Sequence, residues 1–350
     1  MTRIRLQDVA ERAGVSIKTV SNVVNGKGVI TEATRLRVEE ALAALQYRPN
    51  VAARHLRQGR SGMIAVALPE LNQPYFAEIA SELVRAAKAR QLTVLLNQTD
   101  GAAGSERAIS DGIDMPLMDG LIMSPLALTA EDLRHRVDSA PIVLLGEHVG
   151  DDSPFPHVAI DNRAAARAAT EHLLGLGRDR VAAIGAKRAG ATDATPAETA
   201  ELRLAGYREA LEAAGQPWRH ELVAEVGDFH RSDGAAAMHR LLDLPDPPDA
   251  VFCFNDLLAL GALRALRDRG LTAPDDVAVI GIDDVEEGRF ATPSLSTVAP
   301  DKRGIAETAI DLLLGTGHAP HDSPRDAPRT AIAAHQLIAR ESTLGPGGPP

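Results

Sequence analysis

The side chains that most often catalyse reactions or bind metals are scattered along this 350-residue chain. The single cysteine, Cys253, excludes an internal disulfide framework and a multi-cysteine metal site, and it indicates a reducing compartment. The eleven histidines show no metal-ligand spacing, and we interpret His135, His172 and His335 as surface or packing residues. Neither a P-loop nor a dinucleotide fingerprint follows the apolar run 63–68. We therefore expect no enzyme and no cofactor.

The charges are distributed unevenly along the chain. The first 60 residues hold 11 Lys/Arg and 5 Asp/Glu, a charge of +6. Because the net charge of the whole chain is −11, the other 290 residues carry −17. This split predicts that a basic arm meets a polyanion while an acidic body resists nonspecific contact. The chain does not open with a signal sequence, and its apolar runs are too short to span a bilayer. We expect a cytoplasmic protein with no membrane partner.

Three short helices are predicted in the basic arm. A helix from Leu6 to Ala13 ends at Gly14, Ser16 caps a second helix that runs to Asn25, and Thr31 caps a third. The apolar residues available for a shared core are Val20, Val23, Val24, Leu36, Val38, Leu42 and Leu45. A three-residue turn between two short helices is typical of a helix-turn-helix, although a plain helical bundle shows the same pattern.

From Met63 onward, short apolar strands alternate with amphipathic helices, which is typical of a parallel sheet covered on both faces. We predict strands at 63–68, 92–96, 120–123, 142–145, 181–184, 222–226, 250–254 and 277–282, and helices near 75–89, 104–115, 130–139, 201–214, 232–242 and 256–268. The two sets form two similar lobes. A ligand is expected in the crevice between them, beyond the carboxyl ends of the strands.

Several motifs resemble the lactose/galactose repressor (LacI/GalR) family. Near the N-terminus they are LQDVAERAGVSIKTVSNVVNG at 6–26, YRPN at 47–50 and AARHL at 52–56. In the body they are PYFAE at 74–78, DN at 161–162, HLLGLG at 172–177, RLAGY at 203–207, FND at 254–256, GIDD at 281–284 and LIARES at 337–342. The resemblance implies an α/β fold: an N-terminal helix-turn-helix headpiece plus a two-lobed periplasmic-binding-protein-like body with two parallel-sheet, Rossmann-like subdomains.

The domain boundaries that we predict follow from this resemblance. The headpiece takes residues 1–48, the hinge helix and linker 49–60, the effector-binding and dimerisation domain 61–345, and a flexible tail 344–350. Within the large domain, lobe one is expected at 61–162 and 292–325, and lobe two at 163–291 and 326–343.

The resemblance also implies how the second helix reads DNA in the major groove. Ile17 would meet a thymine methyl, Lys18 would donate to guanine O6/N7, and Asn22 would bond adenine N6/N7. The residues expected to contact phosphates are Ser16, Thr19, Ser21 and Asn25, with Arg54 and Arg57 in the hinge. Leu56 matches the family's minor-groove wedge. Many family members carry Arg where Asn22 stands, which leaves the preferred bases open.

The body motifs imply an effector site. Arg203, Asn255 and Asp283 match positions that bind ligand hydroxyls in the family, and Phe229 matches a stacking aromatic. The remaining candidates are Tyr75 and Phe76, which could stack on a ligand ring, Ser124 and Asp161. Structural roles stay open for three of them: Phe76 as packing, Asn255 as a helix cap and Arg203 as a partner of a surface carboxylate.

Together these observations predict a homodimeric transcriptional regulator, a repressor that binds a pseudo-palindromic double-stranded operator. A small-molecule effector, a carbohydrate in our first interpretation, would control operator affinity from between the lobes. A purine-responsive regulator of the same family is the alternative, and a solute-binding protein is a further one. The sequence predicts neither the effector nor the sign of its effect.

Overall fold

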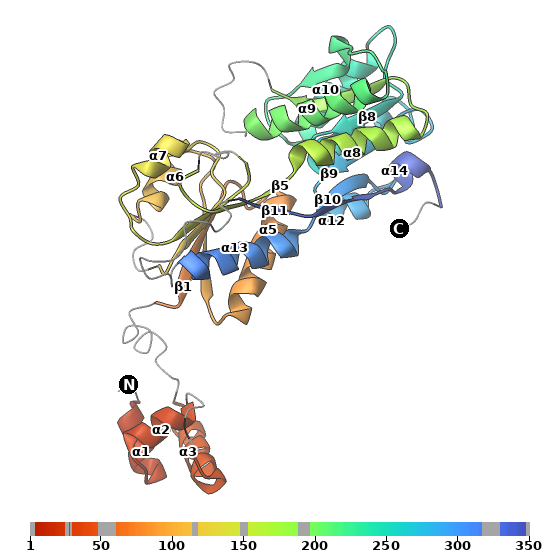
Figure 1. The fold of residues 1–350 in the computed structure, drawn as a ribbon. Helices are drawn as coiled ribbons and strands as arrows, with labels where there is room; N and C mark the ends of the chain where they lie inside the picture. The colour runs from red at the N-terminus through yellow and green to blue at the C-terminus, as the bar shows by residue number, and fades with distance from the viewer. Residues whose placement is uncertain are drawn as a thin grey trace. The chain divides into compact units, whose positions relative to one another are not determined.

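The computed structural model describes residues 4–24, 28, 30–47, 61–113, 118–147, 153–187, 197–316 and 330–347 (Figure 1). The chain divides into two compact units, Met1–Ser61 and Gly62–Pro350. The predicted hinge, with Arg54, Leu56 and Arg57, lies outside the described residues, as does Asn25. In the described part of the chain, no helix is long and apolar enough to cross a membrane.

The first unit contains three helices: α1 (Leu6–Ala13), α2 (Ile17–Val24) and α3 (Glu32–Ala44). Gly14 ends α1 with a φ of 62°, and the Ser16 hydroxyl accepts the Thr19 backbone N–H at 3.1 Å, so a three-residue turn joins α1 to α2. Val9, Ala10, Ala13, Val20, Val38 and Ala41 form the core. The predicted core residue Leu36 is 51% exposed, because Val38 and Ala41 face the other helices instead.

The second unit is built on two six-stranded sheets. The first has the strand order β11-β5-β4-β3-β1-β2 and is parallel throughout. Its strands are β1 (Met63–Leu68), β2 (Thr93–Gln98), β3 (Leu121–Met123), β4 (Ile142–Leu145), β5 (His157–Ile160) and β11 (Thr330–Ala333).

The second sheet has the order β12-β10-β9-β8-β6-β7, parallel except for β12 beside β10. Its strands are β6 (Val181–Ala186), β7 (Val223–Glu225), β8 (Ala250–Cys253), β9 (Ala278–Ile282), β10 (Ser296–Pro300) and β12 (His335–Ile338).

Helices cover both faces of each sheet (Figure 1). Those of lobe one are α5 (Pro74–Ala89), α6 (Ala103–Ser110), α7 (Ala130–Arg134) and α13 (Lys302–Thr316). Those of lobe two are α8 (Asn162–Gly175), α9 (Ala197–Ala213), the 3-10 turn η1 (His220–Leu222), α10 (Arg231–Leu242), α11 (Asp256–Asp268), α12 (Glu286–Arg289) and α14 (Glu341–Leu344). The side chains of β1 point alternately to the two faces of the sheet: Ile64 and Val66 pack toward α5 and α13, and Ala65 packs toward α6 and α7.

The chain passes between the two sheets three times, and two of these crossings correct the predicted lobe boundaries. Segment 292–325 was assigned to lobe one, but β10 lies in the second sheet between β9 and β12, so lobe one resumes only with α13. Segment 326–343 was assigned to lobe two, but β11 pairs with β5 in the first sheet. The physical reason is that one residue, Ala334, separates β11 from β12, so this short segment supplies one edge strand to each sheet.

Candidate effector pocket and DNA-reading helix

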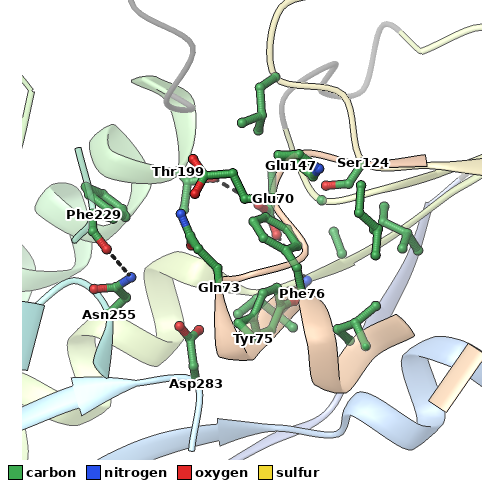
Figure 2. A pocket seen from close by; sticks show the side chains of 18 of the residues that line it. Glu70, Gln73, Tyr75, Phe76, Ser124, Glu147, Thr199, Phe229, Asn255 and Asp283 are labelled. Carbon is green, nitrogen blue, oxygen red and sulfur yellow. Dashed lines mark hydrogen bonds between the residues drawn. The ribbon is translucent and has the colours of Figure 1, made fainter. Parts of the chain in front are cut away.

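A cavity lies at the carboxyl ends of the strands, between residues of the two lobes (Figure 2). Its volume is about 1140 Å³, open solvent at its mouth included. Seven of the eight predicted effector residues line it: Tyr75, Phe76, Ser124, Arg203, Phe229, Asn255 and Asp283. Their contact with a ligand stays a prediction.

Lobe one supplies most of the apolar surface of this pocket. Tyr75 and Phe76 stand in the first turn of α5, with ring centroids 5.4 Å apart and planes at 65°. Pro74 begins that helix, where its missing N–H breaks no helical bond. Ile79 and Leu145 add aliphatic surface beside the rings. This side can pack against the flat or apolar face of a ligand.

Lobe two supplies a fixed guanidinium. Arg203 on α9 is 6% exposed, and its Nε donates to the Asn162 Oδ1 at 2.7 Å. It also donates to the Phe254 carbonyl oxygen. The predicted alternative, a surface ion pair, is therefore wrong for Arg203, because the side chain is buried at the pocket.

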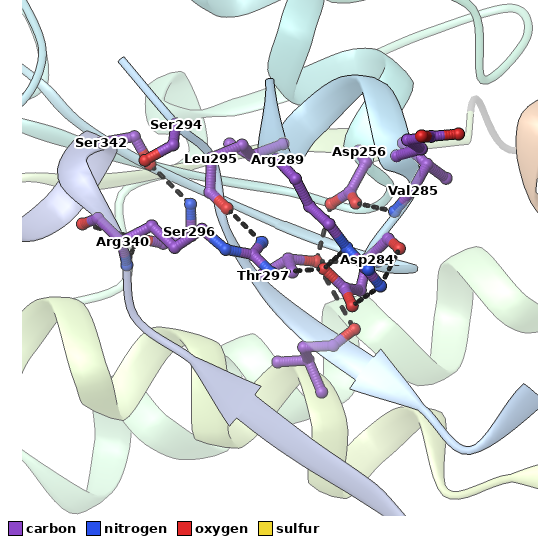
Figure 3. Close-up of polar contacts among 12 residues, drawn as sticks. Asp256, Asp284, Val285, Arg289, Ser294, Leu295, Ser296, Thr297, Arg340 and Ser342 are labelled. Atoms are coloured by element: carbon purple, nitrogen blue, oxygen red, sulfur yellow. Dashed lines mark hydrogen bonds and ion pairs between the residues drawn. The ribbon is translucent and has the colours of Figure 1, made fainter. Parts of the chain in front are cut away.

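Asp283 and Asp284 follow β9, and their carboxylates meet different partners. Asp283 has a φ of 125° and lines the pocket, where burial raises the pKa of its carboxyl to about 7 although Arg203 opposes the rise. Asp284, with a φ of 52°, forms ion pairs with Arg340 at 2.7 Å and Arg289 at 2.5 Å (Figure 3). One carboxylate is thus left for a ligand, and the other holds the C-terminal segment.

Asn255 combines both roles that the sequence left open. Its Oδ1 accepts the Leu258 N–H at 2.9 Å and so caps α11. Its Nδ2 donates to the Phe229 carbonyl oxygen at 3.1 Å, which ties the loop before α10 to the pocket (Figure 2). The Phe229 ring packs edge to face on Phe254, with centroids 6.4 Å apart.

Asp161 is a correction to the predicted site. It is exposed and does not line the pocket, because its carboxylate turns back to accept the Ala164 N–H at 2.8 Å and caps α8. The next residue, Asn162, lines the pocket instead. Its Nδ2 is buried without a hydrogen-bond partner within the described structure.

Glu147 is a pocket residue that the sequence analysis missed. Its carboxylate accepts the Ile160 N–H at 3.2 Å and the Thr199 hydroxyl at 3.3 Å, a contact between the lobes. Burial raises the pKa of Glu147, and Arg203 opposes the rise. The available signal was its position just after strand 142–145. Burial likewise raises the pKa of Tyr75, with Asp283 and Glu147 adding to the effect.

The pocket mouth carries a second polar contact between the lobes. His230 Nε2 lies 3.4 Å from the Glu70 Oε2 and 3.3 Å from the Gln73 Nε2. Glu70 and Gln73 follow β1, and His230 precedes α10. The sequence analysis did not predict His230 or Glu70 as pocket residues.

The structure places the predicted DNA-reading residues of the first unit at and along α2. Ile17 is 48% exposed, which is unusual for an isoleucine, and Lys18 is exposed beside it. Asn22 is partly exposed one turn further on. The Thr19 hydroxyl lies 2.9 Å from the Ser16 hydroxyl at the helix start, and Ser21 is partly exposed. An apolar, a cationic and an amide side chain thus stand on one short helix.

Other chemistry is not evident in the described residues. Their His, Cys, Asp and Glu side chains form no group of three that could hold a metal ion. Cys253 is buried, and burial raises the pKa of its thiol, which makes it unreactive.

Comparison with known families gives two matches. A family described as bacterial regulatory proteins of the lacI family matches residues 5–50. A family described as a periplasmic binding protein-like domain matches residues 170–343.

Comparison with individual proteins gives matches over nearly the whole chain. The ribose operon repressor of Halalkalibacterium halodurans is 32% identical over 99% of this chain and 98% of its own length. A transcriptional regulator CelR solved with cellobiose is 32% identical, covers 97% of this chain and 100% of its own, and has a TM-score of 0.68. The lac repressor dimer solved with operator and the anti-inducer ONPF is 27% identical, covers 98% and 99%, and has a TM-score of 0.80.

Proposed function

The chain belongs to the lacI family of bacterial regulatory proteins, and from this premise we propose that it is a transcriptional repressor whose operator affinity a sugar controls. The matches confirm both the family and the α/β fold class that the sequence motifs predicted. One relative that matches over nearly the full length is a ribose operon repressor, and structures of similar chains hold an operator or cellobiose. Family members are DNA-binding regulators, so we propose a cytoplasmic DNA-binding protein without enzymatic turnover.

The observation that carries the DNA-binding proposal is the exposed start of α2. Ser16 caps this helix, so Ile17 and Lys18 occupy its first turn, where a recognition helix meets base edges. Val20, one turn into the helix, is fully buried and anchors it to the bundle. In a homodimer two such helices meet two half-sites, so the operator is a pseudo-palindrome. The minor-groove role of Leu56 belongs to the same proposal.

The pocket supports control by a ligand that touches both lobes. Tyr75 and Phe76 come from lobe one, and Arg203, Asn255 and Asp283 come from lobe two. A ligand held between them binds one arrangement of the lobes better than another, and it shifts the population by that difference in affinity. Aromatic rings combined with a few polar groups are what a sugar ring needs.

We expect the purified protein to select fragments with an inverted repeat from genomic DNA. Anisotropy measurements with such a fragment should show log affinity falling linearly with log salt concentration.

Lys18→Ala should cost about 1–3 kcal/mol of discrimination at one base pair per half-site. The control is Arg264→Ala, which removes an exposed cation from α11 and should change nothing. Failure to bind any duplex at low salt would refute the proposal, and a uniform loss with Lys18→Ala would make that residue a phosphate contact.

A further inference from the structure

Carboxylates predominate among the charged side chains that line the described pocket. Glu70, Glu147, Asp228 and Asp283 face one guanidinium, that of Arg203. Three of these acids lie at the ends of strands: Glu70 after β1, Glu147 after β4 and Asp283 after β9. Carboxyl groups therefore outnumber the guanidinium among the described side chains that an anionic ligand would meet.

The guanidinium of Arg203 is already compensated. It donates to Asn162 and to the Phe254 carbonyl, and its charge lowers the pKa of both Glu147 and Asp283. Lys187, which follows β6, donates to the Gly227 carbonyl, and its Nζ lies 5.8 Å from the centroid of the Phe229 ring. Arg203 supplies the Lys or Arg charge among the described residues that line the pocket, and Glu147 and Asp283 already oppose that charge.

Two of the described helix N-termini at the pocket are already capped by side chains. Such termini bind phosphates when their N–H groups are free. The Asp161 carboxylate caps α8 and Asn255 caps α11. Neither α5 nor α10 has a side-chain cap, but Pro74 begins α5 without an N–H, and Asp233 places a carboxylate in the first turn of α10.

The hydrogen-bonding groups that remain suit a hydroxyl. Asn162 Nδ2 is a buried donor without a partner in the described structure, and Asn162 is 2% exposed. Asp283 is 6% exposed and offers acceptor oxygens to the same pocket. A hydroxyl group accepts from the first and donates to the second, whereas a phosphate oxygen without a proton can only accept.

Resting on the proposed function, we infer that the pocket takes an unphosphorylated polyhydroxylated ligand and rejects the phosphorylated form of the same compound. A bound phosphate would either repel Glu147 and Asp283 or require their protonation. Burial already raises the pKa of both groups, so further negative charge is costly there. Asn162 becomes a ligand-binding residue by the same argument.

Calorimetry on the full chain, without DNA, tests this inference with matched pairs: ribose and ribose 5-phosphate, glucose and glucose 6-phosphate, adenosine and AMP. At least one unphosphorylated member should bind, and its phosphorylated partner should bind about 30-fold or more weakly, equivalent to about 2 kcal/mol. A phosphorylated member that binds as tightly as its partner overturns the inference, and so does a panel in which no unphosphorylated member binds.

Variants identify the cause of the selectivity. Glu147→Gln should reduce the difference in affinity between the unphosphorylated ligand and its phosphorylated form, because it removes one repelling charge and keeps the shape of the side chain. Asn162→Asp keeps the acceptor for Arg203, removes the Nδ2 donor and should weaken the unphosphorylated member at least about tenfold. Glu171→Gln is the control, an exposed carboxylate paired with Arg167 on α8. An unchanged difference in affinity in Glu147→Gln would contradict the charge mechanism. Because no operator is present, these results are independent of whether the protein binds DNA.

Discussion

At the scale of single residues, Asp283 and Asp284 show how two adjacent carboxylates reach opposite surroundings. Both have positive φ, which Asp tolerates better than most residues, and the sharp turn sends their side chains to different sides of the strand end. Asp284 meets Arg340 and Arg289, whereas Asp283 faces the pocket, where the charge of Arg203 is the main one that favours its ionised form. The Asp283 carboxylate is therefore available to a ligand, and its burial lowers the stability of the folded protein when it is ionised.

That cost predicts a pH-dependent effect of Asp283→Asn. The folded pKa of about 7 exceeds the unfolded value of about 3.9, so the wild type binds this proton more tightly when folded. The free energy of unfolding of the wild type therefore falls as pH rises from about 4 to about 7, and the asparagine variant escapes this loss. We expect the variant to melt at a higher temperature than the wild type at pH 8, with a smaller difference at pH 5, and to lose effector binding.

Asp284→Asn is the matched control for this prediction. It leaves the buried Arg340 without its carboxylate and should lower the melting temperature at both pH values. If Asp283→Asn lowers the melting temperature at pH 8, Asp283 contributes to stability and the interpretation of its burial is wrong.

The sequence predicts some of the individual pocket residues but not all of them. Motifs identified Tyr75, Phe76, Arg203 and Asp283 by type and position. They did not separate Asp161 from Asn162, because the helix start decides which of two neighbouring side chains turns back to cap. Glu147 and His230 were missed because their roles arise only when the second lobe faces the first.

At the scale of elements, the helices of lobe two pack unusually closely through glycines. A Cβ built on Gly206 of α9 would lie 2.1 Å from the Arg163 carbonyl oxygen of α8. The same holds between α10 and α11: a Cβ built on Gly234 or on Gly261 would lie 2.1 Å or 2.0 Å, respectively, from a backbone oxygen of the other helix. These three positions set the distance between helices in each pair.

Gly206→Ala should destabilise the protein by about 1–3 kcal/mol or more, since backbone atoms must separate to admit the methyl group. Chemical unfolding followed by circular dichroism measures this. Gly104→Ala, in α6, is the control because a Cβ there has no atom within 4 Å, and alanine should be neutral or stabilising by up to about 1 kcal/mol. Equal effects of the two variants would show that close packing at Gly206 is not limiting.

Elements with strong apolar periodicity were predicted well. Strands 63–68 and 142–145 and helix 256–268 have the predicted bounds. The four-residue strands β5, β11 and β12 were not predicted, because their sequences HVAI, TAIA and HQLI include polar residues, whereas the equally short β4 is wholly apolar. Helix α8 was seen only as a motif, since its alanine-rich sequence has a weak apolar pattern.

At the scale of the whole second unit, the lobes meet at the pocket mouth through His230 with Glu70 and Gln73. His230→Ala should therefore weaken effector binding about three- to tenfold, mainly by faster dissociation, because this contact between the lobes at the mouth is then lost. Stopped-flow measurements with the ligand identified by calorimetry give this rate. Arg231→Ala is the control, since Arg231 pairs with Glu287 inside lobe two. An unchanged dissociation rate would show that the mouth contacts do not retain the ligand.

The arrangement of β11 and β12 has a consequence for exchanging parts between related genes. Each lobe draws on stretches of chain that alternate along the sequence, with changes of lobe near 161, 301 and 334. A chimera with a single breakpoint between β1 and β12 would therefore combine strands from both parents in at least one sheet. Lobe two can be transplanted intact only as a mosaic with breakpoints near 161, 301 and 334, so an exchange of halves does not carry one parent's lobe whole.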